Sequence, residues 1–319
     1  MLCRALSSAA TYSFHQGAGA SVGSGHVDLR SGRRCPPLFP RERQAMLGLL
    51  RGLEPADWAK ATVCPGWDVH DVVAHVLNDY MRRLSGARDG HSGAVFADDE
   101  TLPAYLARTN AEFVRAGRQL SPRLMIELLE HLGPRLDAVW AAHDLEAPAG
   151  LNVSWAATDV DSPGWLDVGR EYTEFWVHQQ QVRDAVSRPG ATEPELMAPV
   201  LGVFAQALPF TLRACDRPEG TVAVLEVHGP AGGRWSAQWR AGRWRMAAPG
   251  PDLPPVPAGE PAPQAADPGE PAARVSMDQD TFWRLATRGI GVEQARARAE
   301  VSGDAELTAA MTTLLAVIA

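Results

Sequence analysis

The stretch from Val168 to Val186 constrains the fold of this chain most, because its pattern predicts a long helix with one face in a core. Large side chains recur along it at steps of three and four residues, the period of one helix face. These residues are Val168, Tyr172, Phe175, Gln179, Val182 and Val186. Beside this stripe, Glu174 and His178 lie one turn apart, so their side chains can converge on a single ion. Such a pair forms a metal site only if a third ligand joins it.

The sequence offers His75 as that third ligand. After a Pro-Gly turn at 65–66, Asp68 is a suitable N-cap, and the carboxylate of Asp71 suits the positive end of a helix predicted to run to about Leu84. The predicted buried face consists of Val69, Val72, Val73, Val76, Leu77, Tyr80 and Leu84. His75 lies at the edge of this face. Taken alone, it fits a partly buried structural histidine as well as a ligand.

Two further acids lie near the predicted ligands. Glu171 is on the same flank as His178 and rivals Glu174, while Asp79 could be a hydrogen-bond partner of His75. The alternative for each acid is a solvated charge on a helix surface. For Glu171 we favour that alternative.

The other amphipathic segments indicate an antiparallel helical bundle, because they are long and have short or moderate connections. Further helices are predicted at 41–53, 101–114, 121–140 and 195–213. After Cys215 the pattern changes to alternating residues with glycine-rich turns, which predicts an antiparallel meander. Its strands are expected at 221–227, 234–240 and 243–247, with a further strand at 274–277. Asp278 and Asp304 each cap a later helix. The fold class is therefore expected to be α+β, a helical bundle followed by a small α+β domain.

The predicted organisation of the chain has three parts. Residues 1–36 are expected to be a disordered tail, 37–215 the helical bundle, and 216–319 the α+β domain. Within the last part, residues 249–273 are rich in Pro, Ala, Gly and acids and have no apolar period, so a disordered loop is expected.

Composition limits the partners of the chain. A net charge of -8 over 319 residues argues against nucleic acid, whose phosphates require a basic surface. No apolar run approaches the roughly 20 residues of a membrane span. The four cysteines form no Cys-x-x-Cys pair, which favours a reducing cytoplasm over a disulfide scaffold. We expect a soluble cytoplasmic protein, a monomer or homodimer.

The segment CPGWDVHDVVAH that ends at His75, followed by Glu174-x-x-x-His178, resembles the mycothiol-dependent maleylpyruvate isomerase family. The resemblance implies a DinB-like four-helix bundle over 37–215 and a sterol-carrier-like second domain. It also implies that His75, Glu174 and His178 hold a divalent metal, usually zinc, and that mycothiol is the cosubstrate. Two imidazoles and a carboxylate leave a coordination position open.

The same resemblance implies an arginine of the second domain near the substrate carboxylates. In the segment FWRLATRG that residue is Arg288, with Arg284 as its rival and an ordinary surface arginine as the alternative. Thr287 stands where the family often has Gly, and the proline-rich insertion is unusual. Both departures put the isomerase substrate in doubt.

These expectations together predict a metal-dependent and thiol-dependent isomerase or S-transferase. Its substrate would be a small electrophile, with a carboxylate-bearing molecule as one candidate. Two other classes stay open: a metal-binding module that holds a ligand without turnover, and a metal-dependent hydrolase that uses the open position for water.

Overall fold

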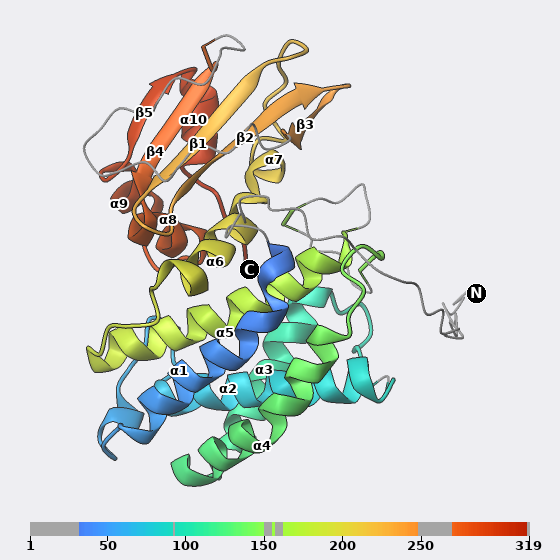
Figure 1. The fold of residues 1–319 in the computed structure, drawn as a ribbon, viewed down its shortest axis with the longest axis vertical. Coiled ribbons are helices and arrows are strands. Elements are labelled where there is room, and N and C mark those ends of the chain that lie inside the picture. Colours follow the sequence, from blue (N-terminus) through green and yellow to red (C-terminus); the bar gives the residue numbers. More distant parts are fainter. Residues whose placement is uncertain (1–31, 92, 150–154, 157–161, 248–269, 318–319) are drawn as a thin grey trace, which may run out of the picture.

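A helical bundle and a five-stranded sheet with its own helices follow one another along the chain (Figure 1). The structure is a computed structural model that describes residues 32–91, 93–149, 155–156, 162–247 and 270–317. The expected α+β class, with a helical N-terminal domain, is confirmed. In the described part of the chain, no helix is both long enough and apolar enough to cross a membrane.

The N-terminal domain is built from amphipathic helices that pack side by side. Its helices are α1 (Phe39–Arg51), α2 (Val69–Arg83), α3 (Leu102–Gly117), α4 (Pro122–Ala141), α5 (Gly164–Val186) and α6 (Pro194–Ala205). The short helix α7 (Leu208–Thr211) follows and packs against the sheet. The ring of Phe39 on α1 contacts Trp140 of α4 and Tyr172 of α5, with centroids 5.8 and 5.4 Å apart. Aromatic packing therefore joins the first helix of the bundle to α4 and α5.

Helix α5 is the central element of the bundle. It packs against α1, α2 and α6, and the side chains of the predicted stripe are all buried. Residues outside that stripe, Trp176 and Val177 among them, are buried as well. Because neighbours enclose α5 on more than one side, its polar residues are drawn into the interior too.

Helix starts agree well with the capping residues in the sequence. Asp68, Asp278 and Asp304 each accept hydrogen bonds from the first backbone N–H groups of the helix that follows. The single helix predicted over 195–213 is wrong, because α6 ends at Ala205 and a new turn of helix begins at Leu208. Proline lacks an N–H and fits the first turn of a helix, so Pro209 lies at the start of α7 rather than inside one long helix.

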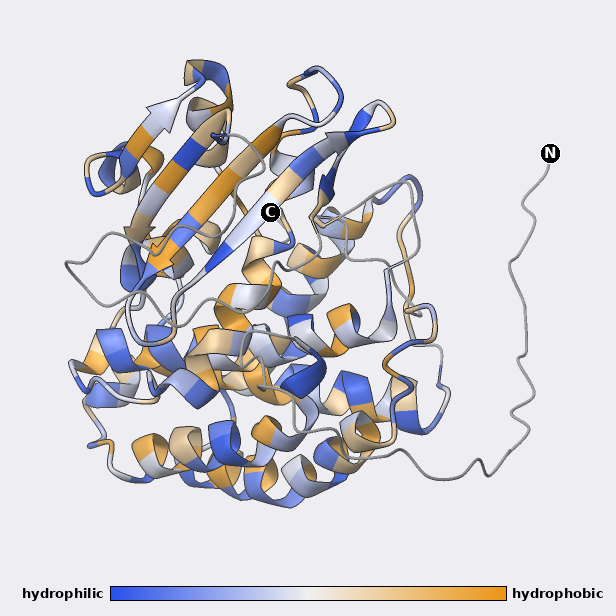
Figure 2. Cartoon of the chain, turned by 45° about the horizontal axis from the view of Figure 1, so that its top comes forward, coloured by the Kyte–Doolittle hydropathy of each residue, from blue (hydrophilic) through white to orange (hydrophobic). Residues whose placement is uncertain are grey.

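The sheet has the strand order β3-β2-β1-β4-β5. Its strands are β1 (Val222–His228), β2 (Gly233–Arg240), β3 (Arg243–Met246), β4 (Ala273–Asp278) and β5 (Glu300–Gly303). The predicted meander β1-β2-β3 is antiparallel, whereas β4 returns beside β1 in the parallel direction. Figure 2 shows hydrophobic residues concentrated in the middle of the sheet, as expected for strands with neighbours on both edges.

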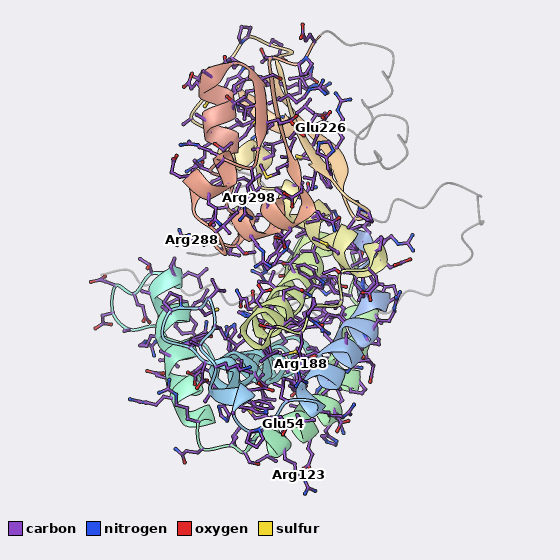
Figure 3. The ribbon with its side chains drawn as sticks, turned by 90° about the vertical axis from the view of Figure 1, so that its left-hand side faces the viewer. Glu54, Arg123, Arg188, Glu226, Arg288 and Arg298 are labelled. Carbon is purple, nitrogen blue, oxygen red and sulfur yellow. The ribbon has the colours of Figure 1, made fainter. Side chains whose placement is uncertain are left out.

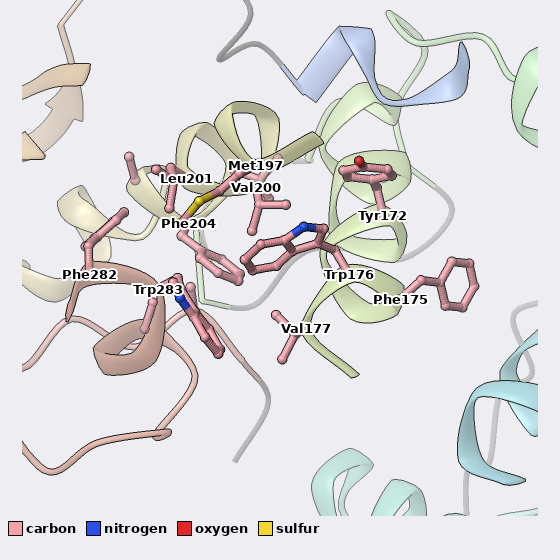
Figure 4. Packing of buried hydrophobic residues seen from close by; sticks show 14 of the residues in the cluster. Tyr172, Phe175, Trp176, Val177, Met197, Val200, Leu201, Phe204, Phe282 and Trp283 are labelled. Atoms are coloured by element: carbon pink, nitrogen blue, oxygen red, sulfur yellow. The ribbon is translucent and has the colours of Figure 1, made fainter. Parts of the chain in front are cut away.

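Helices α8 (Gln279–Ala286) and α10 (Ala305–Met311) pack on this sheet, and α9 (Val292–Arg296) lies between them in the chain. Strand β5 and helix α9 were not predicted. Helix α8 also joins the sheet to the bundle, because Trp283 meets Trp176 of α5 edge-on at 5.5 Å (Figure 4). Arg284 of α8 adds an ion pair with Asp184 of α5.

Two predicted disordered segments need correction at their edges. Residues 32–34 and 36–38 form 3-10 turns, and Cys35 between them is fully buried, so the predicted tail is too long. Ala273, the last residue of the predicted loop, is buried and pairs with β1 and β5. Cys35 and Ala273 are small enough to pack closely against the core, and the composition of a segment does not reveal such packing. Residues 1–31 and 248–269 lie outside the described residues, and the division at residue 215 stays a prediction.

Candidate metal centre

His75 reaches the site from helix α2. The Asp68 cap fixes where this helix begins, and the apolar face holds it against α5, α3 and α4. His75 is only 7% exposed, and its Nε2 lies 3.0 Å from Oε1 of Glu174 on α5. Residues 99 positions apart in the sequence are therefore direct neighbours.

Glu174 and His178 complete the cluster from one face of α5. Nε2 of His178 lies 3.0 Å from the same Oε1 of Glu174, one helical turn away. The two imidazole rings are 4.7 Å apart and edge-on. One ligand atom from each residue lies within 4.8 Å of the others, so the three predicted residues come together at one point. The carboxylate is 38% exposed, which leaves the cluster open on one side.

Gln181 and Cys64 support His178 from behind. The Oε1 of Gln181 accepts a hydrogen bond from Nδ1 of His178 at 2.7 Å and from the Cys64 thiol at 3.2 Å. With the proton on Nδ1, a neutral His178 directs the lone pair of Nε2 at Glu174. Neither residue was predicted from the sequence, although Gln181 stands one turn after His178 and Cys64 opens the Cys-Pro-Gly-Trp turn.

A divalent cation fits this donor set. Two imidazole nitrogens and one carboxylate oxygen are ligands that zinc accepts, and they leave a further position free. His75 Nδ1 is buried without a hydrogen-bond partner in the described structure, so the ring is held by packing against Trp67 and by Nε2 at the cluster. The suggested hydrogen bond from Asp79 to His75 is therefore absent. The negative charge of Asp79 instead raises the pKa of Arg83 and of Glu171.

Electrostatics indicate what the cluster does without a cation. Partial removal from water disfavours the charged form of Glu174, but His178 and His75 outweigh it and hold its pKa well below the usual range. Burial opposes protonation of His178, yet the Glu174 carboxylate raises that pKa to about 10. Burial lowers the pKa of His75, and the positive charges of His178 and Arg82 act in the same direction. A proton on His178 therefore occupies the position that a metal would take.

Glu171 is neither a ligand nor the solvated charge that we favoured. It is 4% exposed and forms ion pairs with Arg83 of α2 and Arg170. Burial raises the pKa of Glu171, and the two guanidinium groups oppose that shift. The expectation failed because the flank of α5 that carries Glu171 faces α2 instead of water.

The structure does not bring either predicted arginine into the cluster by a hydrogen bond or ion pair. Arg288 is exposed with φ 60°, at the edge of the sheet region that faces the bundle (Figure 3). Arg284 donates to Asp184 and Asp280 and lies over the Trp283 ring at 4.3 Å. Arg284 therefore holds α8 on α5 and is already engaged by two carboxylates.

A known protein family and solved structures resemble parts of this chain. The model of the mycothiol maleylpyruvate isomerase N-terminal domain matches residues 39–183. Among solved structures, a histidine-to-alanine variant of the mycothiol-dependent maleylpyruvate isomerase is 16% identical, with a TM-score of 0.48 over 85% of this chain and 92% of its own. The unmodified isomerase is also 16% identical, with a TM-score of 0.46 over 81% and 90%. No curated protein matches the chain.

The family match covers the whole ligand cluster, from the helix that carries His75 to the helix that carries Glu174 and His178. Residues 39–183 of this chain are therefore similar to the mycothiol maleylpyruvate isomerase N-terminal domain.

Proposed function

We propose that this protein is a metal-dependent enzyme that uses a low-molecular-weight thiol, mycothiol, to isomerise or S-conjugate a small electrophile. The observation that carries the proposal is the convergence of both imidazole Nε2 atoms on one oxygen of Glu174. The family of the helical domain supports mycothiol as the thiol. Zinc is the proposed metal, because nitrogen and oxygen donors with one open position are typical of its catalytic sites.

The residues of the chain would divide the work as follows. His75, Glu174 and His178 would hold the cation. Gln181 accepts a hydrogen bond from Nδ1 of His178, which leaves Nε2 as the nitrogen that would bind the cation in place of a proton. Trp67, whose ring centroid is 5.2 Å from that of His75, forms an aromatic wall beside the cluster. When bound, the cation would lower the pKa of a thiol and so supply a thiolate at neutral pH.

The two proposed reactions begin with the same bond. In the isomerisation, a C–S bond forms at a conjugated cis double bond and the electron pair moves onto the neighbouring carbonyl group. The former double bond is now a carbon–carbon single bond, and the adduct rotates about it. The electron pair then returns, the C–S bond breaks, and the thiol and the trans product are released. In the transfer, the C–S bond is kept. The adduct then either takes up a proton on carbon or releases a leaving group with its bonding electron pair. Arg288 stays the sequence-derived candidate for binding a substrate carboxylate.

X-ray absorption on the zinc form, with and without mycothiol, tests the proposal. A new sulfur neighbour at about 2.3 Å from the metal is expected at saturating thiol. Turnover of a panel of cis-enones and alkylating electrophiles then separates isomerase from transferase. A spectrum without sulfur would contradict the thiol-dependent function and favour the hydrolase or the ligand-binding module instead.

A further inference from the structure

One cation near the cluster has no assigned role. Arg82 lies near the C-terminal end of α2 and is exposed, and it makes no hydrogen bond or ion pair with the described residues. The neighbouring arginines differ in this respect, since Arg83 pairs with Glu171 and Arg118 with Asp71. The guanidinium of Arg82 is therefore available to a ligand.

Helix geometry puts Arg82 on the same face as His75. Seven residues at 100° each return to within about 20° of the starting direction, and they advance about 10.5 Å along the axis. Side chains in a helix lean toward its N-terminus, so the long side chain of Arg82 extends back toward His75. The two side chains therefore leave α2 in nearly the same direction, two turns apart.

The nearest acid on α2 does not neutralise Arg82. Asp79 stands three residues earlier, but no hydrogen bond or ion pair joins it to Arg82 in the described structure. A divalent cation at the cluster would exceed the single charge of Glu174 by one. Together with Arg82, the mouth of the site would then carry a positive field that attracts anions.

We propose that Arg82 binds the carboxylate of an anionic substrate and so determines the specificity of the site. This inference rests on the proposed function, because it takes the cluster as the place of reaction. A carboxylate held by Arg82 would direct the electrophilic carbon of a short-chain acid toward the open side of Glu174. A guanidinium suits this task because its paired N–H groups match the two carboxylate oxygens.

The test is calorimetric binding of succinate, an unreactive dicarboxylate, and of neutral succinamide to the zinc-loaded full chain. R82Q should weaken succinate binding by about tenfold or more and leave succinamide unchanged, and R82K should recover part of the loss. R123Q is the matched control, because Arg123 is an exposed arginine at the far end of the bundle (Figure 3). Zinc content measured on each variant shows that the cluster is intact.

Three results would overturn the proposal. The first is succinate binding by R82Q within about twofold of the unmodified protein, and the second is no binding by the unmodified protein at all. The third is a loss confined to R288Q, which would return carboxylate binding to the arginine predicted from the sequence. If succinate binding depends on Arg82 but no thiol-dependent turnover is found, the proposed function fails and the anion site stands.

Discussion

Two carboxylates on α5, Glu171 and Glu174, lie about one turn apart and both contact side chains of α2, yet their surroundings differ. Glu174 meets two imidazoles, and Glu171 meets the guanidinium groups of Arg83 and Arg170. Guanidinium groups only donate and always carry charge, so they satisfy a carboxylate directly. A neutral imidazole presents a lone pair instead, which requires a proton or a cation between it and the carboxylate.

Exposure separates the two groups further. The side chain of Glu171 is 5% exposed and that of Glu174 is 38% exposed. The type of partner and the access to solvent, not the carboxylate itself, therefore distinguish a structural charge on α5 from a candidate ligand.

The largest expected effect is the loss of metal from His178→Ala. This change removes one of three ligands, so zinc retention and thiol reactivity should both disappear. Metal analysis after dialysis measures retention. Glu171→Gln is the matched control on the same helix and should keep its zinc; a loss of zinc in both variants would contradict the distinction drawn between the two carboxylates.

A large effect on stability is expected from Arg83→Met. Removing Arg83 leaves the buried Glu171 with Arg170 as its remaining guanidinium partner, and breaking a buried ion pair costs up to about 3–5 kcal/mol of the free energy of unfolding. Arg82→Met, one residue earlier and exposed, should change it by less than about 0.5 kcal/mol. Urea unfolding of the two variants measures the difference, and equal losses would show that Arg83 is not part of a buried ion pair.

A smaller effect is expected from Gln181→Ala. The ligand His178 would remain, but its Nδ1 would lose the acceptor at 2.7 Å, so zinc affinity should fall by about 10–100-fold. Competition with a chelator of known affinity gives the number. Gln180→Ala is the control, since Gln180 donates to Gly190 O and does not touch the cluster. An unchanged affinity in Gln181→Ala would mean that the ring orientation comes from packing alone.

The smallest effect concerns a third carboxylate beside α5. Glu42 of α1 is 2% exposed and accepts from the neutral amide of Gln179 at 2.7 Å. Burial raises its pKa from 4.5 to about 7, so between these values the folded state binds more protons than the unfolded state. The free energy of unfolding should therefore fall as pH rises across this interval, by no more than about 1.4 kcal/mol per pH unit. Urea unfolding at several pH values should show a weaker fall in Glu42→Gln; identical slopes would exclude Glu42 as the cause.

Much of the fold could be predicted from local sequence. The 3.6-residue period of α5, the aspartate caps at Asp68, Asp278 and Asp304, and the alternation of β1 to β3 are properties of short segments. The break before Pro209 was missed because proline is compatible with both a kink and a new helix start, and packing decides between them. Strand β5, with four exposed residues, has no buried face to leave a pattern.

The sequence by itself determined that Glu174 and His178 share one helix face, because a separation of four residues fixes that geometry in any α-helix. It could not determine that Glu171 would be buried or that Arg284 would bind Asp184, because those partners come from other elements. Only the packing of α2 against α5 placed the Nε2 of His75 beside Glu174 and the Oε1 of Gln181 between His178 and Cys64. Contacts between distant segments depend on how helices cross, and no local periodicity encodes that crossing.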